Sequence, residues 1–115
     1  MSTQAPNVVF VFGDQWRAQA TGYAGNPNVQ TPNLDRLVQR GTTFQRAYTV
    51  NPTCTPTRAS WITGLYPSQH GAYSLGTKLM EAVPTVGDVF QSHGYRTALV
   101  GKAHFQPLSS TPRRR

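Results

Sequence analysis

The chain has 115 residues, enough for one small domain, and is lean in both hydrophobic residues (37%) and charged residues (13%). Its formal net charge is +7, but residues 113–115 are all arginine and supply three of these charges, which leaves +4. The other basic residues are scattered without an aromatic–basic stripe, so we expect no nucleic-acid partner. Residues 1–12 lack a basic region, and their apolar run is too short for a signal peptide or a membrane span. This predicts a cytoplasmic protein with no membrane partner.

Residues 8–12 form the first expected element. Their sequence, VVFVF, is a continuous run of β-branched and aromatic side chains, which is typical of a strand buried on both faces of a parallel sheet. Asp14 and Gln15 follow it, where a ligand-binding loop begins in α/β sheets. A carboxylate and an amide oxygen suit a hard metal ion, although two such ligands do not complete a site. Residues 20–30 are predicted to form a loop.

Residues 31–41 carry the signals of a helix. They begin with a threonine suited to the N-cap and a proline suited to the first helical position, and they end at a glycine. Leu34, Leu37 and Val38 form the apolar stripe. Residues 43–50 alternate enough to predict a second strand.

Two further helices are expected. Residues 58–65 look helical and are ended by Gly64 and Pro67. Residues 83–94 form the other helix, with Thr85 as a cap and a glycine as the stop; its inward residues are Val86, Val89 and Phe90.

Residues 97–100 are a third strand candidate, and the element order favours an α/β layered fold. Residues 106–115 have no periodic pattern and do not close a domain. Two or three strands with so few helices would leave one face and one edge of a sheet uncovered. We therefore expect the chain to be the N-terminal piece of a larger fold; a small complete domain is the alternative.

Cys54 is the only cysteine, which excludes an intrachain disulfide. It lies at an apparent helix start, four residues before Arg58, and Pro56 fixes the backbone between them. A helix N-terminus and an arginine one turn on favour an anion and a reactive thiol. Cys54 can be a buried packing residue, a nucleophile with His70 or His104 as its base, or a metal ligand without a second cysteine at ligand spacing.

Lys102 and His104 follow the third expected strand. They are either an ordinary loop pair or, because a glycine flanks them at a strand end, a pair that binds an anion.

Several stretches together resemble the sulfatase family across residues 7–107. CTPTRASWITG resembles the motif Cys-x-Pro-x-Arg with its trailing Thr-Gly, and YPSQHG follows it as is common in that family. NVVFVFGDQWR resembles the N-terminal strand and metal loop, and TPNLDRLVQRGTTFQRAY the next helix and strand. GYRTALVGKAHF resembles the Gly-Tyr-x-Thr…Gly-Lys-x-His segment.

The resemblance implies the N-terminal part of an alkaline-phosphatase-like, three-layer α/β fold with a mostly parallel sheet, incomplete in this chain. Residues 1–107 would belong to the catalytic domain, and residues 108–115 would be an unstructured basic tail. The implied reaction is hydrolysis of a sulfate monoester. A maturation enzyme would convert Cys54 to formylglycine. One hydroxyl of the hydrated aldehyde would attack sulfur and the alcohol would leave; deprotonation of the other hydroxyl would then expel sulfate and regenerate the aldehyde.

The resemblance also assigns site residues and a metal. The metal is calcium, with magnesium or manganese as alternatives, and Trp16 and Arg17 shape the pocket beside it. His70 and His93 match no catalytic position and are expected to be structural or exposed. The metal ligands would be Asp14, Gln15 and the modified Cys54, and the other catalytic residues Arg58, Lys102 and His104.

Two departures from the family pattern leave alternatives open. Gln15 stands where many sulfatases have a second aspartate, and the Asp-Gln version also occurs in phosphonate and phosphate monoester hydrolases. The family's second pair of metal ligands, an Asp followed by Asn or His, lies downstream of everything in this chain. We therefore expect poor metal affinity and an inactive isolated chain, and a catalytically inactive truncated remnant is the third alternative.

Overall fold

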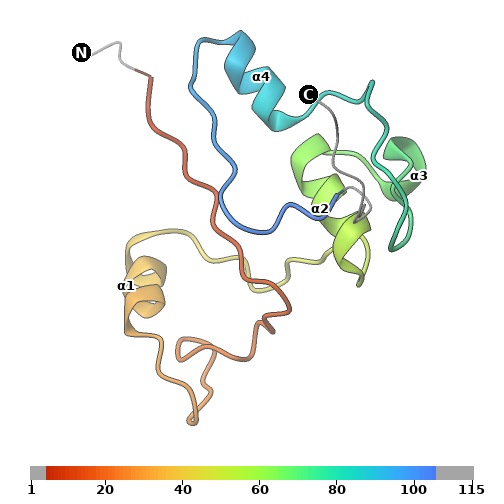
Figure 1. Ribbon diagram of the computed structural model, residues 1–115. Helices are drawn as coiled ribbons and strands as arrows, with labels where there is room; N and C mark the ends of the chain where they lie inside the picture. The colour runs from red at the N-terminus through yellow and green to blue at the C-terminus, as the bar shows by residue number, and fades with distance from the viewer. Residues whose placement is uncertain (1–4, 106–115) are drawn as a thin grey trace. The chain divides into compact units, whose positions relative to one another are not determined.

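The computed structural model describes residues 5–105, which are helical and irregular (Figure 1). The helices of this part are α1 (Pro32–Arg40), α2 (Cys54–Thr63), α3 (Pro67–His70) and α4 (Val86–Ser92). None of them is long and apolar enough to cross a membrane. The chain divides into two compact units, Met1–Arg46 and Ala47–Arg115, so the site residues are divided between separate units. The predicted tail, residues 108–115, lies outside the described residues.

Helix α1 confirms the local signals of its sequence, since it begins at Pro32 and ends before Gly41. Thr31 stands at the N-cap position, but its hydroxyl does not cap the helix. It accepts a hydrogen bond from the Gly22 amide (2.8 Å) and donates one to Asp35 Oδ1 (2.8 Å). The same carboxylate oxygen accepts from the Tyr23 amide (3.1 Å), so α1 holds the loop before it.

The three expected strands are absent from the part of the chain that the structure describes. Residues 8–12, 43–50 and 97–100 are irregular, and side chains that a sheet would bury are exposed, such as Val9 (82%) and Val100 (92%). A strand exists only through hydrogen bonds to a neighbouring strand. Each of these three segments has the side-chain pattern of a buried strand, but residues 5–105 contain no strand with which it pairs.

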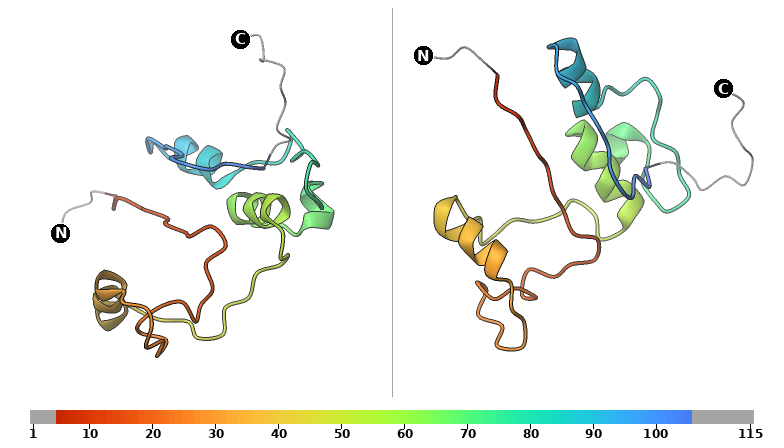
Figure 2. Two further views of the ribbon diagram at one scale, coloured as in Figure 1. Left: turned by 60° about the horizontal axis from the view of Figure 1, so that its bottom comes forward. Right: turned by 60° about the vertical axis from the view of Figure 1, so that its left-hand side comes forward.

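The second unit is organised around α2. Figure 2 shows α2 beside α3 from both directions, and α2 contacts both α3 and α4. Helix α2 begins at Cys54, earlier than the residues 58–65 expected from the pattern. It ends at Gly64, a left-handed C-cap (φ 71°) whose amide donates to the Ser60 carbonyl (2.8 Å). The small core against this helix consists of Ala59, Ala72 and Leu79, with Ile62, Val83 and Phe105 packed on it.

The two short helices differ from expectation in detail. Pro67, expected only as a stop, is the first residue of α3. The predicted cap of α4 is confirmed, because Thr85 Oγ1 accepts from the Asp88 amide (3.3 Å) and Asp88 Oδ2 accepts from the Thr85 amide (2.7 Å). The predicted inward placement of Val86 and Val89 is wrong, because their side chains are 48% and 50% exposed. Leu37, from the predicted apolar stripe of α1, is also exposed (66%). The surfaces that would cover these side chains are not formed by residues 5–105.

Candidate active site

The loop before α2 is fastened by Asn51. Its side-chain oxygen accepts hydrogen bonds from the amide (2.8 Å) and the hydroxyl (2.5 Å) of Thr53. Its backbone carbonyl accepts from the hydroxyls of Thr49 (3.2 Å) and Thr57. These contacts fix the point at which the helix begins. Asn51 was expected in a proline-bounded loop, residues 51–55, and was not among the predicted site residues.

Cys54 is the first residue of α2 and is partly exposed. The first turn of this helix contains no acidic residue, so nothing there neutralises the positive end of the helix dipole. The predicted placement of Cys54 at a helix start is confirmed. Its chemical role stays a prediction.

Arg58 joins α2 to the segment that contains Lys102 and His104. Its side chain is only 4% exposed, and its Nη1 donates a hydrogen bond to the Lys102 carbonyl, 44 residues away in sequence. The Lys102 side chain itself is exposed. The structure therefore brings together two of the predicted catalytic residues, and the contact runs through the backbone of Lys102.

His104 has an unusual conformation. Its φ of 54° lies in the left-handed region, which a residue with a Cβ seldom adopts. Its Nδ1 is buried and has no hydrogen-bond partner within residues 5–105, and the same holds for Thr55 Oγ1, next to Cys54. Buried polar atoms are normally paired, and both belong to predicted site segments. The two unpaired atoms are therefore a feature of these segments.

Asp14 and Gln15 are exposed and belong to the unit Met1–Arg46. Gln15 also has a left-handed φ of 54°, and the neighbouring Trp16 is held by a bond from its Nε1 to the Ala20 carbonyl (2.8 Å). The oxygen donors of Asp14 and Gln15 suit a hard divalent cation, which takes six to eight such ligands when it is calcium. Residues 5–105 contain no group of three or more His, Cys, Asp or Glu side chains that could hold a metal. The oxygen donors of Asp14 and Gln15 fit part of a metal site, and their role as ligands stays a prediction.

His70 is a structural residue, as expected. It is fully buried, its Nδ1 accepts a hydrogen bond from the Ala72 amide (3.1 Å), and its Nε2 lies 2.9 Å from Ser60 Oγ. Because Nδ1 is the acceptor, the ring proton is on Nε2, which therefore cannot accept a proton from the Ser60 hydroxyl. This arrangement excludes general-base action on Ser60. His93 is exposed, also as expected.

Burial lowers the pKa of His70 below 6.5, against smaller opposing effects of hydrogen bonds with the backbone at His70 and Pro56. The unfolded chain then binds the proton more readily, so the free energy of unfolding falls as the pH drops below about 6.5, by at most about 1.4 kcal/mol per pH unit. Urea unfolding between about pH 8 and about pH 5 measures this slope.

His70→Gln should flatten the slope, whereas His93→Gln at an exposed position should keep it. Asp88, whose pKa is lowered from 3.8 chiefly by the Thr85 hydroxyl, loses its contribution only below about pH 4 and does not interfere. An equal slope in the parent chain and in His70→Gln would contradict the assignment.

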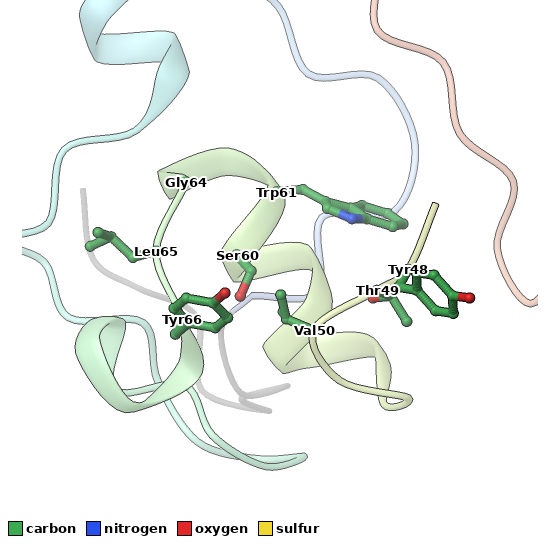
Figure 3. Close-up of a pocket in the computed structure, with 8 residues that line it drawn as sticks. All are labelled: Tyr48, Thr49, Val50, Ser60, Trp61, Gly64, Leu65 and Tyr66. Atoms are coloured by element: carbon green, nitrogen blue, oxygen red, sulfur yellow. The ribbon is translucent and has the colours of Figure 1, made fainter. Parts of the chain in front are cut away.

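A groove of about 270 Å³ lies between the C-terminal half of α2 and the irregular segment that precedes the helix (Figure 3). It contains no histidine, cysteine, carboxylate, lysine or arginine, and none of the predicted site residues lines it. Groups that could transfer protons or bind an oxyanion are instead found around Cys54 and Arg58, so we place the candidate site there. The groove is lined by Tyr48, Thr49, Val50, Ser60, Trp61, Gly64, Leu65 and Tyr66.

Comparison with known families decides the affiliation of the chain. The model of the family described as Sulfatase matches residues 6–113. The chain belongs to the sulfatase family. The Cys54 motif at the start of α2 lies within the region that the family model matches.

Similar curated proteins agree with this affiliation. An ulvan-active sulfatase of Formosa agariphila is 44% identical over 99 residues, covering 86% of this chain and 19% of the relative. An arylsulfatase of Clostridium perfringens is 38% identical, covering 89% and 21%, and an N-acetylglucosamine-6-O-sulfatase of Bacteroides thetaiotaomicron is 33% identical, covering 89% and 18%. The chain spans about a fifth of the length of these curated relatives. No solved structure matches the chain significantly.

Membership implies the coarse fold and chemistry of the family. The fold is α/β and alkaline-phosphatase-like, and members generally use a formylglycine and a divalent metal. The helices of residues 5–105 are consistent with such a fold, while its sheet is not formed by these residues.

Proposed function

We propose that this chain forms the nucleophile's half of a sulfuric ester hydrolase that acts on sulfate monoesters. The observation that carries the proposal is the junction between α2 and the Lys102–His104 segment. Cys54 opens the helix, and Arg58, one turn later and almost fully buried, holds the Lys102 carbonyl. The contact joins the positive start of a short helix and the Arg58 guanidinium to the loop that contains Lys102 and His104, which supports a site built from these groups. Such a set suits an oxyanion.

The residues take distinct roles in this proposal. Converted to formylglycine by a maturation enzyme, Cys54 would supply a hydrated aldehyde whose hydroxyl attacks sulfur. Arg58 and the helix N-terminus offset the negative charge that develops next to Cys54. Lys102, with an exposed side chain, binds the ester oxygens. His104 hydrogen-bonds the reacting group through its ring.

Asp14 and Gln15 would supply two ligands of a divalent metal ion, and the modified Cys54 would supply a third. We propose calcium, with magnesium or manganese as alternatives, because oxygen donors suit hard cations. When bound, the metal would neutralise charge on the sulfate oxygens. The remaining ligands would come from polypeptide that corresponds to the part of the relatives beyond this chain.

The test is hydrolysis of an aryl sulfate by a complete enzyme that contains this chain, expressed in a host that forms formylglycine. We expect metal-dependent turnover that a chelator abolishes and added calcium restores. A complete, matured enzyme that releases no sulfate from any of a panel of aryl, sugar and sterol sulfates would contradict the proposal. The inactive remnant would then be favoured.

A second candidate is hydrolysis of phosphonate or phosphate monoesters, favoured by the Asp14-Gln15 pair. A neutral amide beside the metal changes the charge of the site relative to a second aspartate. The comparison uses an aryl sulfate and an aryl phosphonate with the same leaving group. A higher kcat/KM for the phosphonate would replace the first candidate by this one, and Gln15→Asp should then move the preference toward sulfate.

We also propose that residues 8–12, 43–50 and 97–100 become strands of a mostly parallel sheet, in a three-layer arrangement, within the complete enzyme. Their exposed β-branched and aromatic side chains support this, because water-exposed apolar runs of this kind need a cover.

Amide hydrogen exchange tests the sheet. Amides of residues 8–12 should exchange at least about 10³-fold more slowly in the complete enzyme than in the 115-residue chain, because ladder hydrogen bonds protect them. Amides of α1 provide the internal control, since that helix is already formed. Equal exchange of residues 8–12 in both proteins would contradict the sheet.

A further inference from the structure

The segment that follows the third expected strand is anchored at both ends. At one end, the Lys102 carbonyl accepts a hydrogen bond from the buried Arg58 guanidinium. At the other end, Phe105 packs on the core of the second unit, and its carbonyl accepts from the Leu79 amide (3.2 Å). Gly101, before the segment, has a left-handed φ of 94°, which lets the chain turn into it.

His104 lies between these two anchors and has an intrinsically unfavourable backbone conformation. A left-handed φ of 54° is disfavoured for a residue with a Cβ. Such a conformation persists when surrounding contacts over-determine it. The two anchors lie on either side of His104, and the Arg58 contact comes from a charged side chain that is distant in sequence.

We propose that Arg58 is a positioning residue for Lys102 and His104, acting through the backbone carbonyl of Lys102 independently of any contact with the substrate. Its guanidinium fixes the loop, holds His104 in the left-handed conformation and thereby sets the directions of both side chains. What those side chains bind rests on the proposed function. The placement of the loop does not, and it can be measured in the 115-residue chain.

The experiment compares His104→Gly with His104→Ala in three backgrounds. Both variants remove the ring, so their difference isolates the cost of a Cβ at a left-handed φ. In the parent chain, glycine should lower the unfolding equilibrium constant about fivefold relative to alanine. In Arg58→Lys, which keeps the charge but loses the planar fork, the difference should vanish or reverse. In Arg96→Lys, an exposed matched control in the same unit, it should remain about fivefold.

Two results would overturn the proposal: an equal glycine–alanine difference in all three backgrounds, or no difference in the parent chain. If Arg58→Lys does not fold, hydrogen exchange of the Arg58 Nη protons in the parent decides the matter. Slow exchange supports the contact, and exchange at the rate of a free guanidinium overturns it. Failure of the proposed sulfatase activity would leave these outcomes unchanged, because none of them depends on turnover.

Discussion

Cys54→Ala should lower kcat/KM for an aryl sulfate by at least about 10³-fold in the complete enzyme, because it removes the precursor of the nucleophile. The free energy of unfolding should change by less than about 1 kcal/mol, since Cys54 is partly exposed and alanine is a good helix former. Steady-state kinetics together with urea unfolding measure the two quantities on the same preparation. The expected pattern is a large loss of activity with the fold retained.

Ser68→Ala is the matched control for this loss. Ser68 lies in the short helix α3 and is exposed, and its substitution also removes one small polar atom. It should keep kcat/KM within about twofold of the parent, as expected for an exposed position away from the site. A Cys54→Ala enzyme that retains a tenth or more of the parent activity would show that Cys54 is not the source of the nucleophile.

The second large effect is expected for Lys102→Ala, which should lower kcat/KM by about 10²-fold to 10³-fold. An ammonium that binds the ester oxygens acts on charge that grows toward the transition state, so most of the loss should be in kcat. The substitution leaves the backbone carbonyl that Arg58 holds, and the side chain is exposed. The free energy of unfolding should therefore stay within about 0.5 kcal/mol of the parent.

Lys78→Ala provides the control for charge. Lys78 is also an exposed lysine, paired with Glu81 at 2.5 Å, and such surface pairs contribute little to stability. It should leave kcat/KM unchanged at moderate salt, because it removes the same net charge without removing a side chain assigned to the proposed site. Equal losses in Lys78→Ala and Lys102→Ala would reduce the role of Lys102 to overall charge.

The helices were predictable because their signals are local. A proline at the first position and a glycine after the last one set the bounds of α1, and Thr85 caps α4 as expected. The predicted strands are not formed within residues 5–105, because a strand depends on a partner that is remote in sequence. Residues 8–12 illustrate this, since their pattern is that of a buried strand and their environment in residues 5–105 is open.

The site shows the same division between local and remote information. The spacing of Cys54 and Arg58 predicted a helix start facing an anion, and α2 does begin at Cys54. No pattern in the sequence indicated that Arg58 would hold a carbonyl 44 residues away, because a backbone acceptor leaves no trace in the residue type. The left-handed conformation of His104 was equally hidden, since it follows from anchors on either side of the residue.

Peptide mass spectrometry of Cys54 in the complete enzyme, purified from a host that matures such sites, tests the central claim most directly. The account predicts a peptide in which the thiol sulfur has been replaced by an aldehyde oxygen, and which reacts with a hydrazide. An enzyme that hydrolyses sulfate esters at full rate while its Cys54 peptide carries only an unmodified thiol would contradict it.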